Sequence, residues 1–357
     1  MFPNDPAAMV AEAHKNTTWG SGRARFLPDQ IKFLTDGAIY SQLMQMREGY
    51  TDGHKGAWIM DPDVFTTAFQ TFWDADYHIH VHNNGDAGMD VLLANIEQAQ
   101  RRKPRFDHRT TIVHFGFARP EQIEKAGRLG CIVSANPYYV TALAGRYAEI
   151  GIGPERARRM VPLADAARAK MSISFHSDMP MAPAKPLQLM WSAVNRITAE
   201  GPVSGPDQRV DLDTALRAMT IDAAYSVRLE SEIGSITPGK LANFTILEQS
   251  PYAVALTALK DIPVWGTVLE GRVQKAPASP APVKRTDAPV GPRSARAKFF
   301  GFTKPTAPRF SALDVSTAMQ SVCDHPFCIH TGPDAAIGCA RGGSAFSAVI
   351  DATLNRG

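Results

Sequence analysis

Residues 78–83 read HIHVHN, and this short stretch decides the fold that the sequence predicts. Polar and apolar residues alternate in it, which is the period of a β-strand. The three histidines therefore share one face, and the isoleucine and valine share the other. The preceding segment, Asp61–Tyr77, has the pattern of a helix with Asp61 as its N-cap and Pro62 in the first helical position.

The same alternation of strands and helices continues along the chain. Strands are expected at Gln30–Thr35, His78–Asn83, Thr110–Phe115, Cys131–Ala135 and Met171–His176, and helices at Asp61–Tyr77, Ala87–Arg101, Pro120–Leu129, Leu163–Lys170, Pro186–Ile197 and Ile221–Arg228. Strands that alternate with helices predict an α/β fold with a parallel sheet. Five such units are fewer than the eight that close a barrel.

Composition and element pattern divide the whole chain into four segments. Residues 1–29 are an N-terminal lead-in to the βα region, residues 30–230. Residues 231–275 are rich in β-branched residues and Gly turns, which predicts a small antiparallel β-segment. Residues 276–357 form a Pro-rich linker and a tail of weak periodicity, for which we expect disorder. The tail holds Cys and His at positions 323–330 that could bind zinc, although their spacing matches no finger motif.

Charge and cysteine content exclude several classes of protein. The net charge is only +3, from 38 basic and 35 acidic residues, so no nucleic-acid partner is expected. No apolar run reaches the roughly 18 residues of a membrane helix, and the N-terminus lacks the pattern of a signal peptide. One cysteine stands alone and three lie near the C-terminus, which is not a disulfide framework. We therefore expect a cytoplasmic protein that contacts neither nucleic acid nor membrane.

Polar residues recur at or near the ends of the predicted strands, where a parallel βα fold places its active site. They are Lys32, His82, His114, Asn136, His176 and Asp178. A lysine that points into the fold either forms an ion pair with Asp36, reaches water, or is carboxylated by CO₂ into an anionic ligand. Asp178 is either a metal ligand that also accepts a proton or a turn residue before a proline.

Other polar residues have competing interpretations. His78 and His80 fit a hydrogen-bonded interior layer of the fold, and His82 is the best ligand candidate of the three. His176 fits a metal ligand, a substrate contact or a core histidine. Asp86 fits a helix cap better than a catalytic group.

Six motifs occur in a fixed order along residues 20–275. They are Lys32-x-x-x-Asp36-Gly37, His82-x-x-Gly85-Asp86, Val113-His114, Ser134-x-Asn136-Pro137, His176-Ser177-Asp178-x-Pro180, and Gly234-Ser235-Ile236-x-x-Gly239-Lys240-x-Ala242-Asn243. With this set the sequence resembles amidohydrolase family 3 of the metal-dependent hydrolase superfamily. The chain departs from the family pattern by lacking Glu before His114 and by having Asn136 for Gln, His176 for Gly and Asn243 for Asp.

The resemblance implies a role for each matched residue. Lys32 would be the carboxylated bridging ligand, His82 and His114 ligands of the second metal, and Asp178 both metal ligand and proton shuttle. The expected cofactor is one or two divalent ions, with zinc as the first choice. Contacts to substrate or to the ligands are expected from His80, Asp86, Asn136 and His176. The implied fold is a partial TIM-like (β/α) barrel, about strands 4–8, with a remnant of a small β-sandwich domain.

The resemblance also implies a function, together with its alternatives. Metal-activated water would hydrolyse carbon–nitrogen bonds, other than peptide bonds, in small-molecule amides. The family's first strand ends in His-x-His, and nothing upstream of Lys32 matches it. One alternative is therefore a truncated, inactive amidohydrolase fragment, or an interaction subunit that needs a complementary chain or forms a homo-oligomer. Another is a metal-dependent esterase or deaminase. Substrate, metal identity and oligomeric state stay open at this stage.

Overall fold

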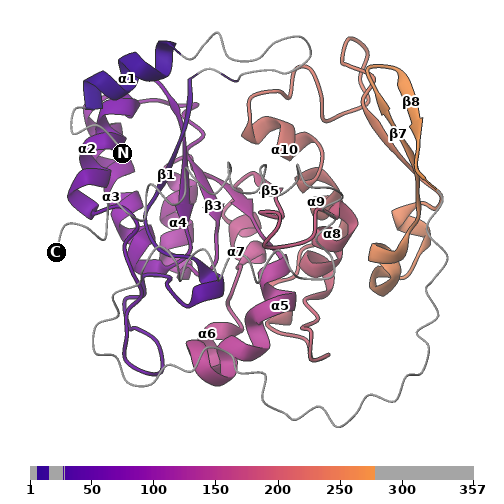
Figure 1. Cartoon of the computed structure of the whole chain (residues 1–357), viewed down its shortest axis with the longest axis horizontal. Helices are drawn as coiled ribbons and strands as arrows, with labels where there is room; N and C mark the ends of the chain where they lie inside the picture. Colours follow the sequence, from indigo (N-terminus) through magenta and orange to yellow (C-terminus); the bar gives the residue numbers. More distant parts are fainter. Residues whose placement is uncertain (1–5, 16–26, 28, 278–357) are drawn as a thin grey trace, which may run out of the picture. The chain divides into compact units, whose positions relative to one another are not determined.

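A five-stranded parallel sheet is the centre of the protein in the computed structural model, which describes residues 6–15, 27 and 29–277 (Figure 1). Its strand order is that of the sequence: β1 (Gln30–Leu34), β2 (His78–Asn83), β3 (Thr111–His114), β4 (Ile132–Ala135) and β5 (Ile173–Phe175). The predicted α/β class with parallel strands is thus confirmed. Within the described residues, β1 and β5 are the two edges of this sheet.

One face of the sheet is an apolar layer under the helices. Adjacent strands pair Phe33 with Val81, Val81 with Ile112, Ile112 with Val133, and Val133 with Ile173. All five side chains are buried. Because side chains alternate along a strand, the polar residues next to this row point to the opposite face of the sheet.

Helices, several of which contact the sheet, alternate with the strands along the chain. They are α1 (Pro6–Lys15), α2 (Pro62–Asp74), α3 (Asp86–Arg102), α4 (Pro120–Arg128), α5 (Tyr138–Arg146), α6 (Pro154–Ala157), α7 (Leu163–Arg168), α8 (Pro186–Asn195), α9 (Leu212–Ala218) and α10 (Ile221–Ser226). Shorter turns are η2 (Ile39–Ser41), the π-helical η3 (Tyr147–Gly151), η4 (Pro206–Gln208), η5 (Pro251–Ala253) and η6 (Leu256–Asp261). Helix α2 starts as predicted: the Asp61 carboxylate accepts the backbone N–H of Asp63 at 2.9 Å.

Helix α5 is an element that the sequence analysis did not predict. It begins directly after Pro137 with two tyrosines, a valine and a threonine, which are poor helix formers. Burial of Tyr139, Val140 and Ala144 overrides this low propensity. Helix α5 brings Tyr139 to the carboxyl end of the sheet, where it matters for the site.

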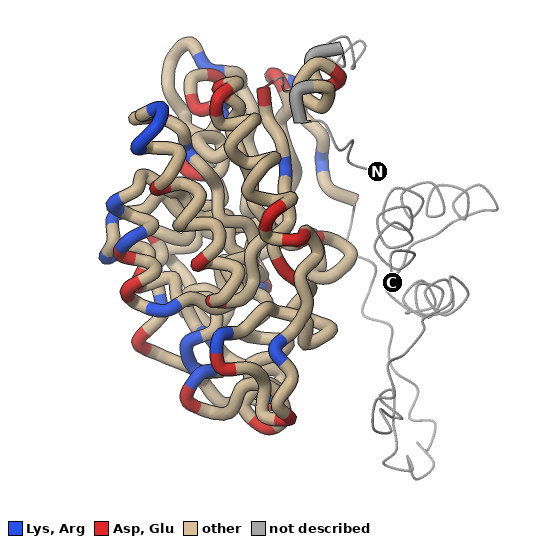
Figure 2. The backbone as a smooth tube through the Cα atoms, turned by 90° about the vertical axis from the view of Figure 1, so that its left-hand side faces the viewer, with Lys and Arg blue, Asp and Glu red and all other residues tan. Residues whose placement is uncertain are grey.

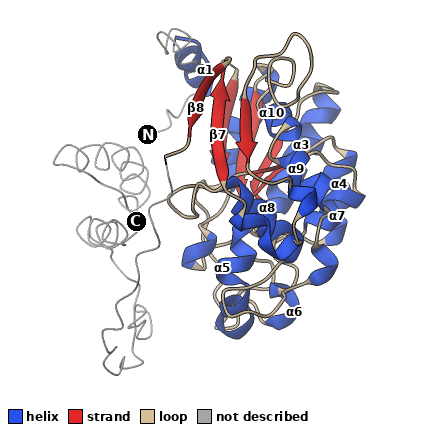
Figure 3. Cartoon of the chain, turned by 90° about the vertical axis from the view of Figure 1, so that its right-hand side faces the viewer, coloured by secondary structure: helices blue, strands red, loops and turns tan. Residues whose placement is uncertain are grey.

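A second, antiparallel sheet consists of β6 (Phe244–Leu247), β7 (Val264–Leu269) and β8 (Arg272–Lys275) (Figure 3). The turn η6 joins it to helix α8. The indole N–H of Trp191 donates to the carbonyl of Thr257 at 2.8 Å, and the Asn195 amide donates to that of Leu256 at 2.9 Å. Leu259 is completely buried in this contact region.

Charged residues of both signs are interspersed over the face shown in Figure 2. No helix in the described part of the chain combines the length and hydropathy that crossing a bilayer requires. The tail that was expected to be disordered, with its Cys and His cluster, lies outside the described residues from position 278 onward.

Candidate functional site

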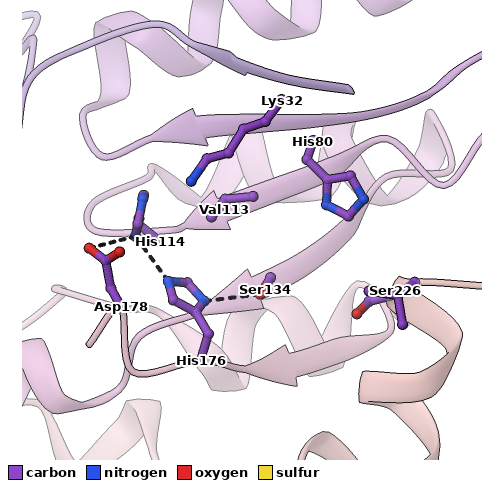
Figure 4. A pocket seen from close by; sticks show the side chains of 9 residues that line it. Lys32, His80, Val113, His114, Ser134, His176, Asp178 and Ser226 are labelled. Carbon is purple, nitrogen blue, oxygen red and sulfur yellow. Dashed lines mark hydrogen bonds and ion pairs between the residues drawn. The ribbon is translucent and has the colours of Figure 1, made fainter. Parts of the chain in front are cut away.

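A cavity of about 260 Å³ lies on the polar side of the parallel sheet (Figure 4). It is lined by Lys32, His80, Val113, His114, Ser134, His176, Asp178, Ser226 and Val227. Four of the five strands, together with the segments that follow β5 and α10, contribute to the lining. The structure therefore gathers residues that are up to about 200 positions apart in sequence.

Lys32 extends from the middle of β1 along the cavity, with its amine directed toward His114 (Figure 4). The side chain reaches solvent, yet the surrounding protein lowers the pKa of the amine, mainly through burial. The carboxylate of Asp178 opposes this shift. No ion pair with Asp36 forms, because that carboxylate accepts the backbone N–H groups of Gln45, Asn84 and Gly85.

His82 lies at the end of β2, buried beside the cavity. Its ring centroid is 4.4 Å from that of His114. The Asn84 amide lies 3.1 Å from its Nε2 atom. Burial, with a smaller contribution from Lys32, lowers the pKa of His82 to about 4. The ring is therefore neutral at physiological pH, which is the form that binds metal ions.

His114 reaches the cavity through an unusual backbone conformation. Strand alternation would place it on the same side as Ile112, toward the helices. Its φ angle is 76°, in the left-handed region that non-glycine residues rarely adopt, and its imidazole lines the cavity instead. Such a conformation costs about 1–2 kcal/mol, and conformations of this kind gather at functional sites.

Three groups surround the Nδ1 atom of His114. Nε2 of His176 lies at 3.0 Å, the hydroxyl of Tyr139 at 3.2 Å, and a carboxylate oxygen of Asp178 at 4.0 Å. Burial, together with His82, His176 and Lys32, lowers the pKa of His114 well below its usual value. This ring too is neutral at physiological pH.

His176 continues the chain of contacts toward β4. Its Nδ1 atom lies 3.0 Å from the hydroxyl oxygen of Ser134. Burial lowers the pKa of His176 to about 3. Ser134, His176 and His114 thus form one hydrogen-bonded row across the cavity (Figure 4).

Asp178 follows β5 in a left-handed conformation, with φ of 53°. Its side chain is 43% exposed, and burial raises its pKa while Lys32 lowers it. Asn136 steadies this loop, because its buried amide donates to the carbonyl of Ser177 at 3.1 Å. Asn136 therefore acts on the loop that carries Asp178, and it does not itself line the cavity.

The other histidines of β2 lie apart from this row. His78 is buried, and its Nε2 atom lies 2.7 Å from the carbonyl of Arg109. His80 lines the cavity, with its ring away from the Lys32 amine (Figure 4). The Nε2 atom of His80 is buried, and no group among the described residues hydrogen-bonds to it.

Asp86 lies in the first turn of α3 and is completely buried. Its carboxylate accepts the backbone N–H of Arg47 at 2.9 Å and the Nε–H of Arg119 at 2.7 Å. It is not among the residues that line the cavity. Its contacts join α3 to two neighbouring segments, which is a structural role.

Sequence reasoning did not single out Tyr139 or Ser226 as site residues. Tyr139 lies on a helix whose residues gave no helical signal, although an aromatic pair directly after a strand end is a visible feature. Ser226 ends α10 and lines the far part of the cavity. Only the packing of α10 near β4 and β5 brings it there.

The side chains gathered at the cavity are of types that bind divalent cations. Two neutral imidazoles and a carboxylate are common zinc ligands. Within the described residues, however, no three His, Cys, Asp or Glu side chains are placed so that they could hold a metal ion.

Comparison with known proteins gives two curated relatives of similar identity. The N-substituted formamide deformylase of Arthrobacter pascens is 31% identical over 199 residues, covering 54% of this chain and 36% of that protein. Protein LONG AFTER FAR-RED 3 of Arabidopsis thaliana is 28% identical over 226 residues, covering 62% of this chain and 39% of that protein. The chain thus matches less than half the length of these relatives.

A solved structure shares the fold. The crystal structure of an uncharacterized metal-dependent hydrolase from Pyrococcus horikoshii OT3 has a TM-score of 0.58 at 23% identity, covering 69% of this chain and 50% of that chain. The family model described as "Amidohydrolase family" matches residues 5–274, which is well over half of the 357 residues. The resemblance seen in the sequence motifs is confirmed, and the chain belongs to the amidohydrolase family.

Proposed function

We propose that this chain takes part in metal-dependent hydrolysis of carbon–nitrogen bonds in small amides. One observation carries the proposal: Lys32, His82, His114 and Asp178 come from four different strands or strand ends and meet around one cavity. The name of the Arthrobacter pascens relative makes N-substituted formamides the first substrates to test.

We also propose that β1 to β5 correspond to strands 4–8, approximately, of a TIM-like barrel. In such a barrel the carboxyl ends of the strands carry the catalytic groups, as the cavity does here. The likeness to a metal-dependent hydrolase of known structure, over about half of that chain, supports this assignment.

The proposed metal ligands are a carboxylated Lys32, His82, His114 and Asp178, with zinc as the expected ion. The lowered pKa of Lys32 supports carboxylation, because only the neutral amine adds to CO₂. That addition forms an N–C bond, releases a proton and leaves an anionic carboxylate on the side chain. A bound divalent cation lowers the pKa of water and polarises a carbonyl oxygen.

The proton transfers are assigned to Asp178. Its carboxylate takes a proton from the attacking water as the new carbon–oxygen bond forms, and delivers it to the nitrogen as the carbon–nitrogen bond breaks. A formamide would give an amine and formic acid. Burial raises the pKa of Asp178 toward neutral pH, and a pKa closer to the working pH favours both taking up and releasing a proton.

The test uses the purified full chain with added zinc and bicarbonate. Metal content is measured by mass spectrometry, and formate release is followed with N-substituted formamides. Intact mass shows whether one CO₂ is bound to Lys32. The Asp178→Asn variant should release no formate, whereas Asp63→Asn, an exposed carboxylate on α2, should match the parent. Parent protein that binds zinc and hydrolyses none of these amides refutes the proposal.

A second candidate is an interaction subunit that needs a complementary chain. Two observations favour it: the described residues lack a group of three metal donors, and among the described strands each edge strand of the parallel sheet pairs on one side only. Unpaired strand edges are surfaces to which another chain can add a strand. This candidate predicts that the chain alone binds less than one zinc ion and self-associates or precipitates. A monomer that binds zinc stoichiometrically excludes it.

A further inference from the structure

His176 makes two ring contacts that join neighbouring strands of the site. Its ring lies between Ser134 on β4 and His114 on β3, within 3.0 Å of each (Figure 4). Glycine could make neither contact. The His176 ring therefore reaches a proposed metal ligand.

The charges around His114 differ between the two edges of its ring. The Nδ1 edge faces the carboxylate of Asp178 at 4.0 Å. An ionised carboxylate accepts hydrogen bonds and donates none. The amine of Lys32 lies toward the other edge (Figure 4). The carboxylate beside Nδ1 favours a proton on that atom, which leaves the electron pair of the ring on Nε2.

We infer that His176 is a positioning residue: it accepts the Nδ1–H of His114 at its Nε2 atom, and so leaves the Nε2 atom of His114 free to bind a cation. Ser134 completes the row by accepting the Nδ1–H of His176. Metal-binding histidines commonly donate their second N–H to such a partner, which fixes both tautomer and ring orientation. The benefit of this tautomer rests on the proposed metal-dependent function. The tautomer itself can be measured in the metal-free protein.

The first measurement is the ¹⁵N NMR spectrum of the histidine rings in the metal-free full chain. The expected result is a protonated Nδ1 and a bare Nε2 for His114. In Ser134→Ala, His176 loses its acceptor, so the His114 signals should move toward the opposite tautomer. The His78→Gln variant removes an imidazole that does not line the cavity, and it should leave the His114 tautomer unchanged.

The second measurement is zinc affinity by competition with a chelator. The His176→Gly variant, which has the family residue, should bind zinc about 10–100-fold more weakly. His176→Gln should recover part of that loss, since its side-chain oxygen can accept the same hydrogen bond. Circular dichroism confirms that each variant is folded, and Ser134→Ala provides the test if His176→Gly does not fold.

The outcomes separate this inference from the proposed function. A bare Nδ1 on His114 in the parent protein overturns the inference, whether or not zinc binds. Where the parent protein binds zinc, an unchanged zinc affinity in folded His176→Gly overturns it as well. If the tautomer is as expected but no zinc binds, the inference about His176 stands, and the proposed metal-dependent function fails.

Discussion

Replacement of Arg196 should show most clearly how one side chain stabilises the backbone of residues 158–161 and 204. Arg196 is completely buried, and its guanidinium donates to four backbone carbonyls. They are those of Ser204 at 2.8 Å, Met160 at 2.8 Å, Val161 at 3.0 Å and Arg158 at 3.3 Å. Burial lowers its pKa to about 10, so it stays charged at physiological pH.

The Arg196→Met variant keeps an unbranched apolar stem and removes all the donors. The carbonyl of Val161 keeps a partner, because it also accepts the N–H of Leu163 at 2.9 Å. The two bonds of 2.8 Å, to Met160 and Ser204, dominate the loss. At roughly 2 kcal/mol for each hydrogen bond to a charged group, the free energy of unfolding should fall by about 4 kcal/mol.

Urea unfolding followed by circular dichroism measures this loss. The matched control is Arg209→Met, because Arg209 is exposed and donates to one carbonyl, that of Asn195 at 3.1 Å. The control should lose no more than about 1 kcal/mol. A loss below about 1 kcal/mol for Arg196→Met, with an unchanged dependence on urea, would refute the reasoning.

Three further predictions concern the core and the segments that lead into the site. Burial raises the pKa of Asp36 to about 7, so the folded state binds its proton more tightly than the unfolded state does. This stabilisation is complete below about pH 4 and is lost as the pH rises toward 7. The unfolding free energy of Asp36→Asn should therefore depend less on pH between those values than that of the parent protein. The same pH dependence in both proteins would contradict this. Gly56→Ala should lose about 3 kcal/mol or more, since φ is 98° and a Cβ would lie 2.0 Å from the carbonyl oxygen of Met44. Gly53→Ala, with φ of 93° and open space around it, should lose only about 1–2 kcal/mol in the same urea assay, and equal losses would show that the steric argument is wrong. Phe33→Ala, at a completely buried ring, should cost about 3–5 kcal/mol, and a loss under about 1 kcal/mol by urea unfolding would show that the site repacks.

Much of the fold could be predicted because its signals are local. The HIHVHN stretch forms β2 over His78–Asn83, as its alternation indicates. Its isoleucine and valine lie in the buried layer, with the three histidines on the other side. The position of Asp178 at the cavity also follows from local information, because the carboxyl ends of parallel strands meet at one edge of a sheet.

The course of the chain after β4 could not be predicted in the same way. Helix α5 forms from residues of low helix propensity because burial of Tyr139 outweighs that preference. Arginine is usually found at the protein surface. Arg196 is nevertheless buried, because the surrounding carbonyl groups accept its hydrogen bonds. Both depend on neighbours that are distant in sequence.

By itself the sequence determined the parallel α/β class and the family, since strand period, helix caps and motif spacing are properties of neighbouring residues. Only the tertiary structure decided which way His114 points and what its ring contacts. Strand alternation directs this side chain to the helices, and a φ angle of 76° turns it into the cavity beside His176 and Tyr139. A left-handed residue at a strand end is held by the packing around it, and no local pattern of residues encodes that packing.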